Sequence, residues 1–334
     1  MIIGVIAMFV VAKFHYKLWE RLSVWLFGGA IALLIVVLIL GSAFNTFATS
    51  WLTIFNTSLQ PTEFAKLALI FYLAHWFEVR RADIGNFQYG FIPFCVITGG
   101  FLLPILAQPD LGSAFVITAV AVGIYFAAGA KMRHLAIGFS AAIIFSMLVI
   151  LGSTHVRERF TAFVSSSADC REDFCWQSEQ ATIAVGSGGF FGRGLAQGVQ
   201  KSYWLPQASD DFIFAASAEE LGFIRTALLV LLYGLIAYRG FIIAQGAPSG
   251  FAQLTAVGIT LWITFQAFIN IGVNTDLFPV TGITLPFISY GGSSLIATLI
   301  GVGVLLNISK YSSNAGSFNR RRHSGARPAQ YRRY

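Results

Sequence analysis

The feature that most constrains this sequence is a series of long apolar blocks, several of them ~18 residues or more with few charges. Such a block is about as long as a helix must be to cross a hydrocarbon core roughly 30 Å thick. Because a bilayer offers no water to backbone N–H and C=O groups, these groups must bond within their own segment, as they do in a helix. The alternating segments of a transmembrane β-barrel are absent from the sequence. We therefore predict an all-α polytopic membrane protein.

Charged and proline- or glycine-rich stretches divide the chain into about nine transmembrane helices. Hydrophobic residues make up 56% of the sequence and charged residues 11%, compared with roughly a quarter charged in soluble proteins. We assign residues 1–309 to one transmembrane domain. A polar loop at 153–211, which holds re-entrant or short helical segments, interrupts this domain. Residues 310–334 form a disordered basic tail. The predicted spans are 1–13, 22–42, 61–78, 89–107, 112–130, 134–152, 212–238, 251–273 and 286–308.

The basic residues are distributed unequally between the two sides of these spans. One set of loops, together with the tail, contains fifteen lysines and arginines, whereas the opposite set contains five. Because basic residues stay on the cytoplasmic side, the C-terminus is predicted to be cytoplasmic and the 153–211 loop extracytoplasmic. Nine spans would then place the N-terminus outside. We expect a further span before Met1, lost by truncation or by a late start codon.

The net charge of +7 comes from the tail. Residues 310–334 contain seven basic residues and no acidic one, and the rest of the chain contains 15 of each sign. A basic segment next to a membrane helix is expected to bind anionic lipid of the cytoplasmic leaflet. We expect no nucleic acid as a partner.

Ionisable side chains within membrane helices are costly, so they indicate function or pairing. Glu63 and Lys66 lie three residues apart at the start of a span, where they form either a structural ion pair or the wall of a polar cavity. Gln108 and Asp110 lie in a break between two spans. Asp110 is suited to cap the following helix, and a ligand contact is compatible with that role.

A third cluster lies in and after the polar loop. The glycine run at 186–194 lacks the ending of a nucleotide-binding P-loop, but beside Arg193 and Lys201 its N–H groups could face a diphosphate. Asp211 enters the next span, where a carboxylate at a helix start is favourable. Glu219 and Glu220 lie deeper in that span. No purely structural role would leave two adjacent carboxylates facing lipid.

The fourth cluster runs from 274 to 294 and mixes prolines and glycines with hydroxyl side chains, among them Ser289. This mixture is typical of an irregular helix that lines a cavity. Cys170 and Cys175 lie in the polar loop and form either a disulfide bond or two free thiols. The five histidines are scattered without metal-ligand spacing.

The four clusters, in this order, resemble the shape, elongation, division and sporulation (SEDS) family, the peptidoglycan glycosyltransferases that include FtsW and RodA. The resemblance covers nearly the whole chain, and 159–163 and 199–201 look more like FtsW. The matching stretches are 60–66, 107–112, 128–131, 186–194, 205–222 and 285–294.

The resemblance implies ten spans with both ends cytoplasmic, in the inner (plasma) membrane of a bacterium. It also implies that Asp211 is the essential carboxylate, that it faces outward, and that it acts as general base on the acceptor hydroxyl. The implied reaction polymerises lipid II into glycan strands in cell division or elongation. It inverts the configuration at the sugar C1 and has undecaprenyl diphosphate as leaving group. Lys66, Arg193 and Lys201 would face this diphosphate, where a divalent cation, Mg²⁺ or Mn²⁺, could assist. The residues predicted to bind substrate are Glu63, Lys66, Gln108, Asp110, Arg193, Lys201, Glu219 and Ser289. The implied partners are a single-span class B penicillin-binding transpeptidase and other divisome or elongasome proteins.

This sequence departs from the family pattern at three places. Ser209 and Asp210 replace a usual His-Thr pair, the loop at 165–176 is unusual, and Arg225 stands where a small or apolar residue is common. Two other functions remain open, a flippase or transporter for lipid II or another lipid-linked substrate and a non-catalytic division scaffold. We favour the enzyme because internal repeats typical of transporters are not evident and the polar clusters gather on one side.

Overall fold

The computed structural model describes residues 1–43, 52–54, 57–152, 157, 161, 163 and 173–324. A helix lies at each of the nine predicted spans, and five helices are long and apolar enough to cross a membrane. The nine helices are α1 (Ile2–Lys13), α2 (Lys17–Ala43), α3 (Pro61–Val79), α4 (Ile92–Ala107), α5 (Leu111–Ala127), α6 (Met132–Gly152), α10 (Ile213–Gln245), α11 (Gly250–Asn274) and α12 (Gly292–Ser324).

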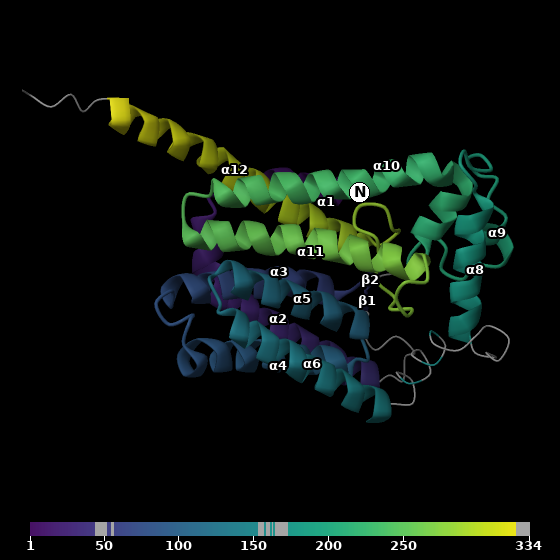
Figure 1. The fold of residues 1–334 in the computed structure, drawn as a ribbon, viewed down its shortest axis with the longest axis horizontal. Helices are drawn as coiled ribbons and strands as arrows, with labels where there is room; N and C mark the ends of the chain where they lie inside the picture. The colour runs from purple at the N-terminus through teal and green to yellow at the C-terminus, as the bar shows by residue number, and fades with distance from the viewer. Residues whose placement is uncertain are drawn as a thin grey trace, which may run out of the picture.

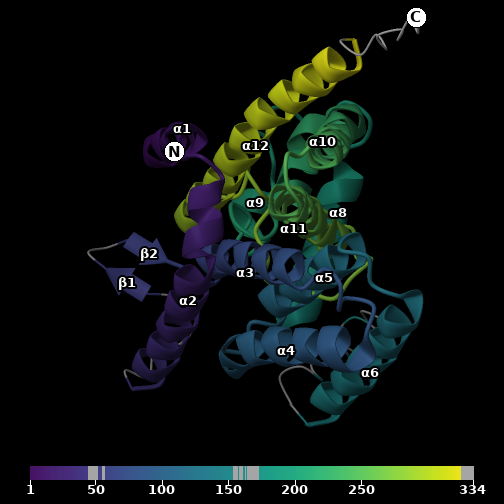
Figure 2. The same ribbon diagram turned by 90° about the vertical axis from the view of Figure 1, so that its left-hand side faces the viewer.

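The helices form a bundle whose two ends differ. α3, α5 and α11 lie in the middle, between α10 and α12 on one side and α4 and α6 on the other (Figures 1 and 2). α8 (Asp173–Ser187) and α9 (Gln200–Tyr203), which belong to the predicted polar loop, lie together at one end. The C-terminal part of α12 projects from the opposite end (Figure 1).

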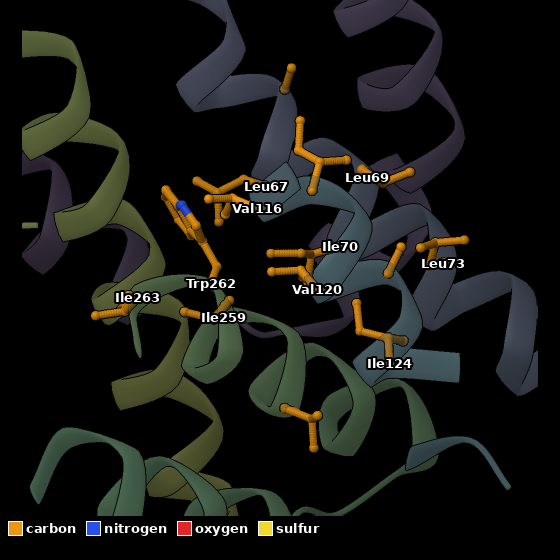
Figure 3. Close-up of a cluster of buried hydrophobic side chains, with 14 of the residues drawn as sticks. Leu67, Leu69, Ile70, Leu73, Val116, Val120, Ile124, Ile259, Trp262 and Ile263 are labelled. Atoms are coloured by element: carbon orange, nitrogen blue, oxygen red, sulfur yellow. The ribbon is translucent and has the colours of Figure 1, made fainter. Parts of the chain in front are cut away.

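The centre of the bundle is held by apolar side chains of α3, α5 and α11. Leu73, Ile124 and Ile259 are fully buried, and burying one such side chain stabilises the fold by roughly 1.5–3 kcal/mol. Because α3 is packed on several sides, it needs no continuous lipid-facing surface and can carry charged residues. Figure 3 shows this cluster, which includes Leu67, Leu69, Ile70, Leu73, Val116, Val120, Ile124, Ile259, Trp262 and Ile263.

The structure differs from the sequence-based expectation at the last span and at the tail. α12 begins at Gly292 and not near residue 286, because Phe287 has a positive φ of 70° and Pro286 precedes it. The tail was expected to be disordered from Lys310, but α12 continues as a helix to Ser324. No proline lies between Lys310 and Pro328 to end the helix earlier.

Three further elements were not predicted. Two short antiparallel strands, β1 (Leu52–Ile54) and β2 (Thr57–Leu59), form a hairpin before α3. A π-helical turn, η1 (Phe87–Phe91), leads into α4. α10 is kinked at Gly222, whose φ of 76° and ψ of 175° are not helical.

Candidate active site

Asp211 lies directly before the start of α10, where two amide side chains fix its backbone. Its carbonyl oxygen accepts hydrogen bonds from Asn270 Nδ2 at 2.8 Å and from Asn274 Nδ2 at 3.0 Å. The next residue, Phe212, is fully buried. The Asp211 carboxylate lies beside Gly282, on which a Cβ atom would be 3.7 Å from Asp211 Oδ2. Asp211 is half-buried, and its carboxylate lies at a place where the neighbouring segment has no side chain.

The irregular segment 275–291 is docked on the residues before α10. Ser289 Oγ donates to the carbonyl oxygen of Asp210 at 2.6 Å and accepts from Leu285 N at 2.7 Å. Tyr290 N donates to the carbonyl oxygen of Ser209 at 2.9 Å. Ser289, predicted to bind substrate, is therefore buried and connects two segments of main chain in this structure.

The first two predicted clusters meet at the starts of α3, α5 and α12. Gln60 N donates to Ser293 Oγ at 3.0 Å, and Gln60 Nε2 lies 3.5 Å from Asp110 Oδ2. Asp110 Oδ1 accepts from Ser113 N at 3.0 Å, which confirms that Asp110 caps α5. A Cβ atom on Gly112 would lie 2.7 Å from the carbonyl oxygen of Thr281, so segment 275–291 reaches this cluster as well.

Glu63 and Lys66 form a buried ion pair. Lys66 Nζ lies 2.7 Å from Glu63 Oε1 and donates to Gln266 Oε1, also at 2.7 Å. The two charged side chains are only 3% and 2% exposed, and Lys66 Nζ is 5.6 Å from the centre of the Trp262 ring. Gln266 in turn donates to the carbonyl oxygen of Thr284 at 3.1 Å. The ion-pair interpretation is confirmed, and binding of substrate by Glu63 and Lys66 stays a prediction.

Gln108 is buried at the turn between α4 and α5. Its Nε2 donates to the carbonyl oxygen of Leu34 at 2.9 Å, and so joins this turn to α2. A substrate contact by Gln108 stays a prediction.

Glu219 faces the 193–201 segment and is fully buried. Its carboxylate accepts from Val199 N at 3.0 Å and Gln200 N at 3.1 Å, and Oε1 lies 3.3 Å from an Arg193 guanidinium nitrogen. The neighbouring Glu220 pairs with Lys201. The two adjacent carboxylates thus face a loop and not lipid.

These pairs qualify one expectation of the sequence analysis. Arg193 and Lys201 were expected to face a diphosphate, and Glu219 to contact substrate. In this structure Arg193 and Lys201 neutralise Glu219 and Glu220 instead. The contacts of Arg193, Lys201 and Glu219 with substrate stay predictions. A bound diphosphate would compete with the two carboxylates for the same cations.

Sequence reasoning missed two polar residues of α11, Gln266 and Asn270, of which Asn270 contacts the Asp211 backbone. Gln266, Asn270 and Asn274 are spaced by four residues and therefore share one helix face, and all three are buried. Of these three residues, only Asn274 belongs to one of the four clusters predicted from the sequence, where it is the first residue. Amide side chains that recur every four residues in an apolar span were the signal that could have identified this face.

The two adjacent carboxylates before α10 differ in their surroundings. Burial raises the pKa of the Asp210 carboxyl above its ordinary value.

In the described ranges, no group of three or more His, Cys, Asp or Glu side chains could hold a metal ion. Cys175 is disulfide-bonded and Cys95 is free. Cys170 lies outside the described residues, so its pairing with Cys175 stays a prediction.

Comparison with known proteins identifies the family of this chain. Residues 1–314 match the FtsW/RodA/SpoVE family, described as cell cycle proteins. Stage V sporulation protein E of Bacillus subtilis (strain 168) is 42% identical, over 93% of this chain and 85% of the relative. A probable peptidoglycan glycosyltransferase FtsW of Geobacter sp. (strain M18) is 40% identical, over 92% and 84%.

The fold has a close match among solved structures. A chain from work on the structural coordination of polymerization and crosslinking by a peptidoglycan synthase complex superposes with a TM-score of 0.78. It is 29% identical, and the match covers 93% of this chain and 87% of the other. The chain described here therefore belongs to the FtsW/RodA/SpoVE family of cell cycle proteins.

Proposed function

We propose that this membrane protein is a peptidoglycan glycosyltransferase that polymerises lipid II into glycan strands. Its similarity to relatives named as peptidoglycan glycosyltransferases supports the reaction class. The observation that carries the proposal is the position of Asp211. Its carboxylate lies before a membrane helix, beside Gly282, and its backbone is fixed by buried amides. A sugar whose lipid tail stays in the bilayer can reach such a position.

Asp211 acts as a general base in the proposed mechanism. It accepts the proton of the GlcNAc C4 hydroxyl while that oxygen attacks C1 of a MurNAc that carries undecaprenyl diphosphate. The new C–O bond forms as the bond to the diphosphate breaks, so the configuration at C1 is inverted. A positioned base typically contributes 10²–10⁴-fold to such a step.

The leaving diphosphate requires positive charge. Arg193 and Lys201 are the candidates closest in sequence to the Asp211 segment, and they would exchange their carboxylate partners for phosphate oxygens. A divalent cation, Mg²⁺ or Mn²⁺, is part of the proposal. Such an ion commonly uses substrate phosphates, waters and one or two carboxylates as ligands, so it needs no dedicated protein cage.

The proposal includes an orientation and a partner. The distribution of basic residues supports a cytoplasmic C-terminus and an outward-facing Asp211, in a bacterial plasma membrane. α8 and α9 lie at the bundle end opposite the C-terminal part of α12 (Figure 1), as this orientation requires. A single-span class B penicillin-binding transpeptidase is the proposed partner, since the similar solved chain comes from a peptidoglycan synthase complex.

The decisive experiment compares Asp211→Asn with Asp210→Asn. Each full-length variant is purified with the transpeptidase of the same organism and supplied with lipid II, and glycan polymer is resolved on gels. We expect Asp211→Asn to lose polymerisation and keep its thermal unfolding temperature. Asp210→Asn serves as the matched control and should retain most activity. Full activity of Asp211→Asn would refute the proposed base.

A flipping assay separates the enzyme from a transporter. Fluorescent lipid II in vesicles should not cross the bilayer faster with wild type than with Asp211→Asn. Flipping by wild type without polymer formation would favour a flippase. Rescue of growth by Asp211→Asn would favour a scaffold.

A further inference from the structure

Three amide side chains on α11 connect the candidate base to the segment beside it. Gln266, Asn270 and Asn274 are all buried, within a helix apolar enough to cross a membrane. A buried amide without partners is costly, so each must be paired with defined groups. All three bind main-chain groups of residues that border the candidate active site. Gln266 also accepts hydrogen bonds from the side chains of Lys66 and Trp262.

Asn270 binds both sides of that site. Its Nδ2 donates to the carbonyl oxygen of Asp211 at 2.8 Å and to that of Ile283 at 2.7 Å. Ile283 directly follows Gly282, the residue next to the Asp211 carboxylate. One side chain therefore fixes the spacing between the carboxylate-bearing backbone and the segment facing it.

Asn274 fixes the same carbonyl from the next helical turn. Its Nδ2 donates to the carbonyl oxygen of Asp211 at 3.0 Å, and its Oδ1 accepts from Ala215 N at 2.9 Å. It thereby holds both Asp211 and the first turn of α10. With its carbonyl bound by two amides from one rigid helix, the Asp211 backbone cannot rotate without breaking buried hydrogen bonds.

We infer that Asn270 and Asn274 are positioning residues that hold Asp211 at the distance and angle needed to accept the proton of the sugar hydroxyl. The inference rests on the proposed function, because it assigns these residues to the same reaction. They do not touch the reacting atoms. Their effect is on the fraction of enzyme–substrate complexes in which the carboxylate meets the hydroxyl, and therefore on kcat more than on KM.

The test replaces each asparagine with leucine, which has a similar size and no hydrogen-bonding group. The full-length variants are purified with the transpeptidase and assayed for kcat and KM with lipid II. We expect a loss of about tenfold in kcat for each single variant and about 100-fold for the double variant, with KM within about twofold.

Asn307 on α12 provides a matched control. It is also buried, and its Nδ2 donates to the main-chain carbonyl of Ala12 at 2.9 Å, remote in sequence from Asp211. Asn307→Leu should lower the unfolding temperature as much as Asn274→Leu and leave kcat near wild type. A double variant Asn270→Leu/Asn274→Leu with kcat within twofold of Asn307→Leu would overturn the inference.

A second pair of variants covers failure to fold. Asn270→Gln and Asn274→Gln keep the amide but add one methylene, which displaces the donor by about 1.5 Å. They should remain folded and still lose kcat, since positioning depends on the location of the donor. Folded glutamine variants with wild-type kcat would refute positioning. Full activity of Asp211→Asn would instead refute the proposed base itself, so the two failures are distinguishable.

Discussion

Two adjacent aspartates before α10 have different environments, and this difference assigns them different roles. Asp211 has its carboxylate beside Gly282 and its carbonyl bound by two asparagines. Asp210 has its carbonyl bound by Ser289, and burial raises the pKa of its carboxyl. A raised pKa means that the folded protein disfavours the charged form of Asp210.

Asp210→Asn should therefore change how stability depends on pH. In the wild type, the charged form costs more in the folded than in the unfolded state. Stability is accordingly lost as the pH rises from the ordinary value of 3.8 through the raised folded value. The variant lacks this loss, so its unfolding temperature should exceed that of the wild type by a margin that grows over this window and then stays constant. Thermal unfolding in nanodiscs from pH 4 to about 8 tests this, and a margin that shrinks with rising pH would contradict it.

At the scale of elements, the kink in α10 and the 188–201 segment form one unit. A Cβ atom on Gly222 would lie 2.2 Å from Gly192 N, and one on Gly192 would lie 2.1 Å from the carbonyl oxygen of Glu220. Such distances exclude any side chain without movement of the backbone. Only glycine at both places lets the loop approach α10 closely enough for Lys201 to meet Glu220.

The pairing between this loop and α10 can be tested by exchanging charges. Lys201→Glu places a carboxylate next to Glu220 and should lower polymerisation of lipid II by about tenfold or more, because like charges repel at close range. The double variant Lys201→Glu/Glu220→Lys restores opposite charges and should recover the unfolding temperature of the wild type. It should not recover the activity, because position 201 then lacks the cation proposed for the diphosphate. The measurements are the polymerisation rate and the unfolding temperature of each variant purified with its transpeptidase.

Gln197→Glu is the control, since it adds negative charge to an exposed position of the same loop. It should remain near wild-type activity. If the double variant were as active as the wild type, Lys201 would act through Glu220 and not on the diphosphate directly.

The sequence predicted the helices better than the segments between them. Apolar length alone located a helix at all nine spans, since only a helix satisfies its own backbone in a membrane. It could not locate the start of α12, because Leu285, Phe287 and Ile288 are as apolar as a helix while the chain there is irregular. Of the site, Asp211 was predicted through family resemblance. The pairing of Glu219 with Arg193 depends on tertiary approach, which residue spacing does not contain.

At the scale of the whole molecule, the buried ion pair lies where the central helices meet. Lys66 on α3 binds Glu63 and also Gln266 on α11, and Gln266 continues to Thr284 in the segment beside the candidate active site. The same helices share the apolar cluster of Figure 3. Bundle stability and the position of segment 275–291 are therefore connected through one polar network.

Removing one charge of this pair should destabilise the whole bundle. Lys66→Met leaves Glu63 as a buried carboxylate without its cation, and such a loss typically costs about 3–5 kcal/mol in free energy of unfolding. The double variant Lys66→Met/Glu63→Gln removes both charges and should recover most of that loss.

Lys17→Met, at an exposed position, should stay within about 0.5 kcal/mol of the wild type. Unfolding of the purified proteins by titration with SDS gives the four free energies. If Lys66→Met were as stable as the double variant, the ion pair would not hold α3 to α11. The expected ranking would mean that the fold requires the central ion pair. Through Gln266 and Thr284 the same pair is connected to the segment beside the candidate active site.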